Sequence, residues 1–337
     1  MSPSNEKTFH KMSNQLIFIT GATGFIGSTT ALEALKAGYR LRICVRKPSE
    51  QLEALLSEYS NQIEFVTVPD LTAETAFDGK LNDVDYVLHL ASPLAKGTKK
   101  EDYFIPAVKG TTALLKAAAK VPSIKKVVIT SSIAALMPIA GVPEGGVVKE
   151  DNDWDFSVDE NANFEDPQNP GLTPLRLYVA SKLLANEATW HFRETAKPHY
   201  ALVTLHPAFV FGPNLVQTSP DNMGTNRLLM NFIMKGDPTA RITGVHVQDV
   251  AEAHIKALDE KFKDGSTYLL AGPKMTGANI APIVRKFYPN SGALVTEDSE
   301  GIMIPNDASK AERELGMRWR SVETLVRDVM DQQLKFL

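Results

Sequence analysis

The sequence predicts an α/β protein with a doubly wound parallel sheet and a smaller C-terminal lobe. Short runs rich in β-branched residues alternate with helical stretches through the first half of the 337 residues, which is the pattern of β-α-β units. The predicted strands are apolar almost throughout, as in VDYVLHLA and KKVVITSS. Such strands are typical of a parallel sheet that helices cover on both faces. The length fits one unit of this kind with an added lobe.

The β-branched runs and the helical stretches give the positions of the predicted elements. The predicted strands lie at residues 15–20, 40–46, 63–68, 85–90, 125–131 and 201–206. The predicted helices lie at 25–37, 104–119, 177–195, 224–235, 246–259 and 321–335. We therefore expect a flexible tail at 1–14, a sheet domain at 15–212 with 246–259 packing back on it, and a lobe at 213–337.

Composition excludes several classes of function. Hydrophobic residues make up 43% of the chain and the net charge is −4, so a core is expected and there is no basic field for nucleic acid or an anionic membrane. No run approaches the ~20 apolar residues of a membrane span. The lone cysteine, Cys44 in LRICV, cannot form an internal disulfide and is expected to be buried. We expect a cytoplasmic protein, a monomer or a weak dimer, with a small molecule as its partner.

A glycine-rich turn, TGATGFIG, follows the first predicted strand and opens the first helix. In such a run Gly21 makes the tight turn, Gly24 lets a pyrophosphate approach the backbone, and Gly27 allows close packing of helix and strand. The helix N-terminus supplies N–H donors. This predicts the dinucleotide site of a Rossmann domain, and a purely structural turn is the alternative. The predicted contacts here are Thr20, Gly21, Thr23, Gly24, Phe25, Ile26 and Gly27.

The end of the second strand indicates which dinucleotide binds. An acid there would hold the free ribose of NAD, but this strand ends in Arg46 and Lys47. A guanidinium suits a 2′-phosphate, so NADP is favoured. Asp70 and Leu71, after the third strand, are expected at the adenine, and a turn carboxylate without a ligand is the alternative for Asp70.

Three residues predict proton chemistry at a carbonyl. Tyr178 and Lys182 are four residues apart in a helical stretch, so they share one face. An ammonium beside a phenol favours the phenolate, which lets the pair exchange a proton near neutral pH. Ser132 ends the strand VVITSS, where its hydroxyl would face the ligand crevice and hydrogen-bond a substrate oxygen. A backbone-capping role is the alternative for Ser132.

The remaining histidines and serines do not indicate a metal site or a hydrolase. His89 and His206 lie in apolar strands, and we expect both to be hydrogen-bonded core residues. The sequence has no HExxH and no cysteine cluster, so no metal is expected. Ser181 lies in no G-x-S-x-G turn, which argues against a serine hydrolase.

The stretch from Glu150 to Pro174 interrupts the α/β rhythm. It is acidic, carries Trp154, Phe156 and Phe164, and runs from the strand of Ser132 to the helix with Tyr178. A long insertion at this place favours a lid over the site, and a solvated surface loop is the alternative.

Together these motifs resemble the extended short-chain dehydrogenase/reductase superfamily, and within it the dihydroflavonol-reductase-like branch with its fungal NADPH-dependent aldehyde and ketone reductases. The resemblance covers Gln15 to about Phe336 and includes TGATGFIG, VRKP, VPDLT, LHLASP, VKGTTALLKAA, VVITSS, YVASK, HPAFVFGP, HVQDVAEAH and ELGMRW. It implies a catalytic triad of Ser132, Tyr178 and Lys182, with Lys182 also holding the nicotinamide ribose. It further implies cofactor contacts by Ala91, Ser92, Pro93, Pro207 and Val210.

Two departures narrow the substrate that the resemblance implies. Met137 stands where plant dihydroflavonol reductases carry the Asn or Asp that binds the flavonoid, and RLYVASK stands where cinnamoyl-CoA reductases have an NWYCYGK-like stretch. A flavonoid or a CoA thioester is therefore not expected. The predicted pocket residues are Ile133, Met137 and Phe209, with Leu229, Met230 and Met234 as weaker candidates that helical spacing also fits to a core.

The expected function is the NADPH-dependent reduction of a hydrophobic ketone or aldehyde to its alcohol, with Tyr178 as the proton donor. Two alternatives stay open. One is an NAD-dependent nucleotide-sugar epimerase or a hydroxysteroid dehydrogenase of the same superfamily. The other is a regulator that senses NADP without chemistry.

Overall fold

The computed structural model describes residues 14–92, 97–165, 168 and 170–336. Within these residues seven parallel strands form one sheet in the order β3-β2-β1-β4-β5-β6-β9. The strands are β1 Leu16–Thr20, β2 Arg40–Val45, β3 Ile63–Thr67, β4 Tyr86–His89, β5 Lys126–Thr130, β6 Ala201–Pro207 and β9 Ser266–Leu270. The predicted doubly wound α/β fold is confirmed, and so are all six predicted strands.

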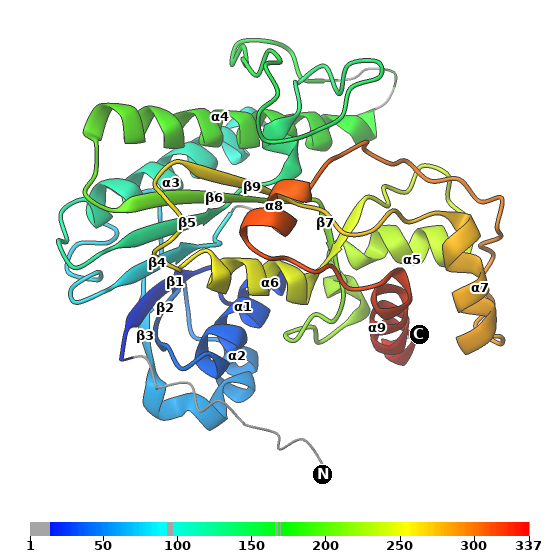
Figure 1. Cartoon of the computed structure of the whole chain (residues 1–337), viewed down its shortest axis with the longest axis horizontal. Helices are drawn as coiled ribbons and strands as arrows, with labels where there is room; N and C mark the ends of the chain where they lie inside the picture. Colours follow the sequence, from blue (N-terminus) through cyan, green and yellow to red (C-terminus); the bar gives the residue numbers. More distant parts are fainter. Residues whose placement is uncertain (1–13, 93–96, 166–167, 169, 337) are drawn as a thin grey trace.

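Helices cover both faces of the sheet (Figure 1). One face carries α1 Phe25–Lys36, α2 Glu50–Leu55 and α6 Val247–Lys256, and the other carries α3 Phe104–Ala118 and α4 Thr173–Ala196. Successive side chains of a strand point to opposite faces, so Ile17 and Ile19 pack with α1 and α6, whereas Leu16 and Phe18 pack with α3. Burial on both faces explains why these strands are apolar throughout.

A smaller lobe lies beside the sheet (Figure 1). It contains the two-stranded sheet of β7 Phe209–Phe211 and β8 Gly244–His246, with α5 Asn226–Lys235, α7 Gly277–Phe287 and α9 Val322–Gln333, and α8 Ser309–Glu314 packs next to β9. The division at residue 212 stays a prediction, but β9, which was not predicted, shows that part of the later chain completes the main sheet.

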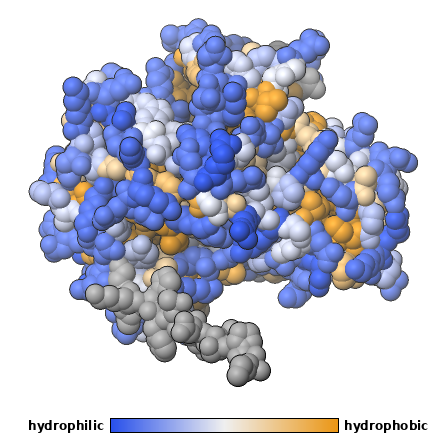
Figure 2. Space-filling model, in the orientation of Figure 1, coloured by the Kyte–Doolittle hydropathy of each residue, from blue (hydrophilic) through white to orange (hydrophobic). Residues whose placement is uncertain are grey.

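The surface and the chain ends add little to the search for a site. Figure 2 shows a mostly hydrophilic face on which hydrophobic side chains gather in small areas. Among the residues with described positions, no helix is both long and apolar enough to cross a bilayer, and no three potential ligands group around a place for a metal ion.

The tail predicted at 1–14 lies outside the described residues, apart from Asn14. Cys44 is buried, as expected, and burial raises the pKa of its thiol to about 12.

Candidate active site

The strand order reverses at β1, which pairs with β2 on one side and with β4 on the other. The loops after β1 and β4 therefore leave the sheet toward opposite faces and open a crevice at its carboxyl edge. Gly21 begins the first loop with φ +79°, and a Cβ on it would lie 2.6 Å from the Ala91 nitrogen. A Cβ on Gly27 would lie 2.0 Å from the Gly21 oxygen. Backbone fills both positions, so only glycine fits them.

The start of α1 fits a diphosphate. Gly24 is the N-cap of α1, and a Cβ there would meet only the Gly21 oxygen, at 3.3 Å. Among the described residues no side chain caps this helix, and its first turn, Phe25 to Ser28, carries no acid. The free N–H groups and the partial positive charge of a helix start suit an anion. Thr23 and Gly24 are exposed at this point, whereas Phe25 and Ile26 are half-buried against the core.

Thr20, at the end of β1, is hydrogen-bonded to the end of β4 and to the loop after it. Its side chain is fully buried, its hydroxyl lies 2.8 Å from His89 Nδ1, and it accepts a hydrogen bond from the Ala91 N–H at 3.2 Å. The expected contact of Thr20 with a cofactor stays a prediction, because this hydroxyl is bonded inside the protein.

The end of β2 presents two exposed cations, Arg46 and Lys47. Neither forms an ion pair with a described residue, so both charges are free to meet an anion. Asp70 accepts hydrogen bonds from the Thr72 N–H and hydroxyl at 2.8 and 2.7 Å, which lower the pKa of its carboxyl. Asp70 thus belongs to a turn, and its expected contact with the adenine stays a prediction. Leu71 packs half-buried beside it.

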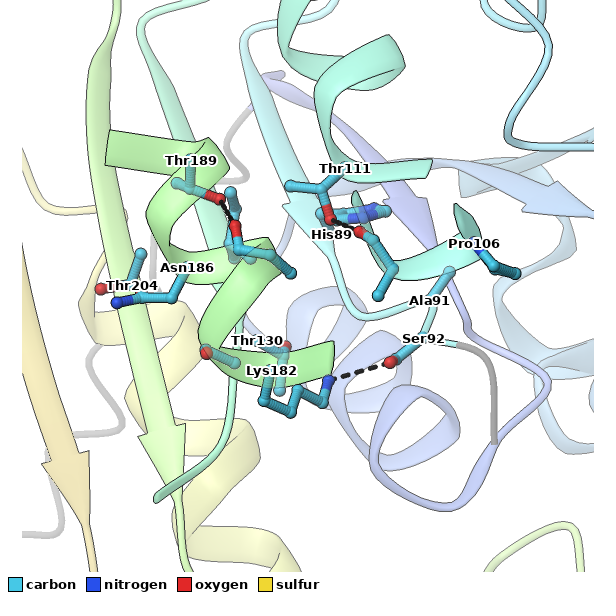
Figure 3. A pocket seen from close by; sticks show the side chains of 14 residues that line it. His89, Ala91, Ser92, Pro106, Thr111, Thr130, Lys182, Asn186, Thr189 and Thr204 are labelled. Atoms are coloured by element: carbon cyan, nitrogen blue, oxygen red, sulfur yellow. Dashed lines mark hydrogen bonds between the residues drawn. The ribbon is translucent and has the colours of Figure 1, made fainter. Parts of the chain in front are cut away.

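Lys182 joins helix α4 to the loop after β4. Its Nζ donates a 2.9 Å hydrogen bond to Ser92 Oγ, in the loop after β4, as Figure 3 shows. The same nitrogen lies 5.6 Å from the centre of the Tyr178 ring, on its own helix α4. The side chain is 7% exposed. The structure thus brings three of the predicted residues together at one place, with a buried ammonium beside a phenol.

Ser132 follows β5, which ends at Thr130, and is the N-cap of the 3-10 turn η3 Ile133–Leu136. Its Oγ accepts a 3.2 Å hydrogen bond from the Ala134 N–H. A hydroxyl that accepts from the backbone keeps its own proton for donation. Helix α4, which carries Tyr178, packs against η3, so Ser132 and the tyrosine belong to the same corner of the sheet.

His89 and His206 are buried and hydrogen-bonded, which confirms the expectation for both. Burial, with a smaller contribution from the charge of Lys182, lowers the pKa of each imidazole to about 4. His206 Nδ1 lies 3.0 Å from the Ser132 carbonyl oxygen, and its Nε2 lies 3.0 Å from Thr204 Oγ1.

A cavity of about 30 Å³ lies behind Lys182, between α3, α4 and strands β4 to β6 (Figure 3). Its lining includes the polar side chains of Thr130, Thr204 and Asn186. The buried Oδ1 of Asn186 accepts no hydrogen bond from any residue that the structure describes. This volume is enough for about one or two water molecules. Sequence reasoning missed the cavity, although Asn186 follows Lys182 by four residues and so shares its helix face.

The predicted pocket residues divide by burial. Met137 and Phe209 are half-buried, while Ile133 is 4% exposed and packs in a core cluster. Leu229 and Met230 belong to the lobe core, which is the alternative that helical spacing allowed. The remaining implied contacts are Pro207 and Val210, both buried, and Pro93, which lies outside the described residues.

The segment predicted as a lid, Glu150 to Pro174, includes positions 166, 167 and 169, which are outside the described residues. Its first part is anchored. The Glu150 carboxylate accepts a 2.7 Å hydrogen bond from the Leu269 N–H, and burial raises its pKa. Phe164 packs edge-on against Phe104 of α3, with the ring centres 5.5 Å apart. The segment thus packs on both the sheet and α3, and its closing motion stays a prediction.

Comparisons with known proteins agree with this geometry. The profile of the family described as "NAD dependent epimerase/dehydratase family" matches residues 17–271. The chain is 60% identical over 330 residues to Ketoreductase sphI of Aspergillus fumigatus, covering 96% of this chain and 99% of that one. Gre2 of Candida albicans in complex with NADPH is 27% identical with a TM-score of 0.76, covering 96% and 99% of the two chains. Yeast methylglyoxal/isovaleraldehyde reductase Gre2 with NADPH is 26% identical with a TM-score of 0.74 and the same coverage.

Proposed function

The chain belongs to the NAD dependent epimerase/dehydratase family, and from that membership and its site we propose that it is an NADPH-dependent carbonyl reductase. Its place in the extended short-chain dehydrogenase/reductase superfamily, in the dihydroflavonol-reductase-like branch, is confirmed. The observation that carries the proposal is the position of the Lys182 ammonium, between Ser92 at the cofactor loop and the ring of Tyr178. The ketoreductase relative and the NADPH-bound neighbours support it.

Ser132, Tyr178 and Lys182 have different roles at a bound carbonyl. When bound, NADPH would supply the hydride for the carbonyl carbon. Ser132, whose hydroxyl donates to none of the described residues, gives a hydrogen bond to the carbonyl oxygen and shares its developing charge. Tyr178 gives that oxygen its proton, and the Lys182 ammonium stabilises the phenolate that remains. The product is an alcohol.

A single variant tests the role of Tyr178. Tyr178→Phe keeps the ring and its packing but removes the proton donor. We expect NADPH binding, followed by fluorescence, to be unchanged, and the consumption of NADPH with aldehydes, diketones and aryl ketones to fall by about 10²- to 10⁴-fold. Full activity of Tyr178→Phe would exclude this assignment, and no consumption of NADPH by the wild type across the panel would count against the whole proposal. NAD retained by the purified protein would favour the epimerase alternative.

The cofactor choice rests on the free cations after β2. If Arg46 holds the 2′-phosphate, Arg46→Ala should raise KM for NADPH by roughly ten- to a hundredfold, the value of one charge-assisted hydrogen bond. KM for NADH should stay nearly constant. Arg40→Ala is a matched control, because Arg40 is an exposed arginine at the opposite end of the same strand. Equal effects of Arg46→Ala on both cofactors would make Arg46 structural.

The proposed substrate is a hydrophobic carbonyl compound. The half-buried Met137 and Phe209 are its candidate contacts, and both side chains are apolar or aromatic. Met137→Asn, which restores the polar residue type of plant dihydroflavonol reductases at this place, should raise KM for an aryl ketone while KM for NADPH stays constant. An unchanged KM for the ketone would remove Met137 from the pocket.

A further inference from the structure

A buried histidine lies next to Ser132 and outside the reacting groups. His206 is in β6, which pairs with β5, and its side chain is fully buried. Its Nδ1 lies 3.0 Å from the Ser132 carbonyl oxygen and its Nε2 lies 3.0 Å from Thr204 Oγ1. A carbonyl only accepts, so Nδ1 carries the proton. Nε2 is then the unprotonated nitrogen of the neutral ring and lies beside Thr204 Oγ1, which also hydrogen-bonds to Thr267 Oγ1 at 3.1 Å. The two partners therefore fix both the tautomer and the ring orientation.

The bond from His206 differs in kind from the other bonds of Ser132. Ser132 Oγ accepts from the Ala134 N–H, and its carbonyl oxygen accepts from the Ala135 N–H at 2.9 Å. Both of these donors belong to η3 itself and move together with the serine. The His206 bond instead ties the serine peptide to the neighbouring strand.

The backbone cannot replace this bond. The ladder between β5 and β6 ends with the hydrogen bond from the Ser131 N–H to the Leu205 carbonyl oxygen, at 2.7 Å. The next donor along β6 would be Pro207, which has no N–H. The imidazole of His206 thus extends the connection between the two strands by one residue, to Ser132 itself.

We infer that His206 is a positioning residue, which holds Ser132 where its hydroxyl meets the substrate oxygen. The inference rests on the proposed function and adds a residue that touches neither substrate nor cofactor. A hydroxyl that donates to a developing oxyanion must be placed within a fraction of an ångström. Without His206 the peptide keeps only the bonds of its own turn, so the turn can shift relative to β5, β6 and α4.

Three variants separate this role from general damage to the core. His206→Asn keeps a donor the same number of bonds from the backbone as Nδ1, while His206→Leu removes it. His254→Leu is the matched control, because His254 is equally buried, with Nε2 2.6 Å from Thr130 Oγ1 and Nδ1 2.7 Å from the Val250 carbonyl oxygen in its own helix α6. Within the part of the chain that the structure describes, His254 forms no hydrogen bond to Ser132 or to η3.

Steady-state kinetics give the first readout. We expect His206→Leu to lower kcat by about ten- to a hundredfold, the scale of a misplaced catalytic group, with KM for NADPH unchanged. His206→Asn should recover most of this loss, and His254→Leu should keep wild-type kcat. In a Ser132→Ala background His206→Leu should cost nothing more, because the group that it positions is gone. An equal loss of kcat in both backgrounds, or in the His254 control, would overturn the inference.

Hydrogen exchange gives a second readout that needs no turnover. In the free protein, His206→Leu should speed exchange across 131–137, and His206→Asn should leave it at the wild-type rate. If the wild type reduces no carbonyl, the proposed function fails and hydrogen exchange still decides whether this bond holds Ser132. Unchanged exchange across 131–137 in His206→Leu would refute the positioning role.

Discussion

Acidification from pH 7 to pH 5 should destabilise the protein through its buried histidines. His89, His206 and His254 are 3%, 0% and 0% exposed, and burial lowers the pKa of each from 6.5 to about 4. In this pH range the folded protein keeps all three rings neutral, while the unfolded chain binds a proton on each. The unfolded state therefore gains free energy as the pH falls. The stabilisation is complete above pH 6.5 and is lost as the pH falls toward 4.

The size of the effect follows from the two pKa values. At pH 5 a histidine with a pKa of 6.5 when unfolded and about 4 when folded favours unfolding by about 2 kcal/mol. Three such residues together reach about 6 kcal/mol, which is comparable with the whole stability of a typical domain. Acid should therefore unfold the protein at a pH where most surface carboxylates are still ionised.

Urea denaturation at pH 7, 6 and 5 measures this loss. His254→Gln cannot titrate, so the difference in unfolding free energy between pH 7 and pH 5 should be about 2 kcal/mol smaller than in the wild type. His191→Gln is the control, because His191 is exposed on α4, and it should keep the full wild-type difference. A wild type with equal stability at pH 7 and pH 5, or a His254→Gln variant with an undiminished pH dependence, would refute the reasoning.

Two further predictions concern the glycine turn and the acidic segment. Gly27→Ala should abolish NADPH binding and lower the Tm, since its Cβ would lie 2.0 Å from the Gly21 oxygen; Gly110→Ala, where nothing lies within 4 Å, is the control and should raise the Tm slightly. Normal binding by Gly27→Ala would show that the turn can relax. Hydrogen exchange across 150–165 should slow when NADPH and a substrate bind, and unchanged exchange would identify this segment as a surface loop.

The sheet could be predicted from the sequence because most of its strands are short, continuous apolar runs. Runs such as VVITSS are apolar on both faces and stand between clear helical stretches, so strand and helix differ in length and period. The lobe lacks that contrast. Helix α7 contains Pro282, which as a sequence signal argues against a helix interior.

The candidate site was predictable only where spacing carries the information. Tyr178 and Lys182 share a helix face, and the glycine turn follows a strand, so local geometry pointed to them. The contact of His206 with Ser132 joins residues 74 positions apart, and it depends on the register of β5 against β6. No local period encodes that register. The sequence therefore indicates which groups react, but only the fold shows which groups hold them.

The way in which the chain returns to its sheet has a consequence for biosynthesis. A nascent chain that ends at residue 212 already contains the glycine turn, Ser132 and Tyr178. It still lacks α6, which covers α1, and β9, which pairs with β6. An uncovered apolar helix face and an open strand edge favour association with other chains. We therefore expect the ribosome-bound intermediate to need chaperone protection until about residue 270 has emerged, and the cofactor-binding half to aggregate when it is expressed alone.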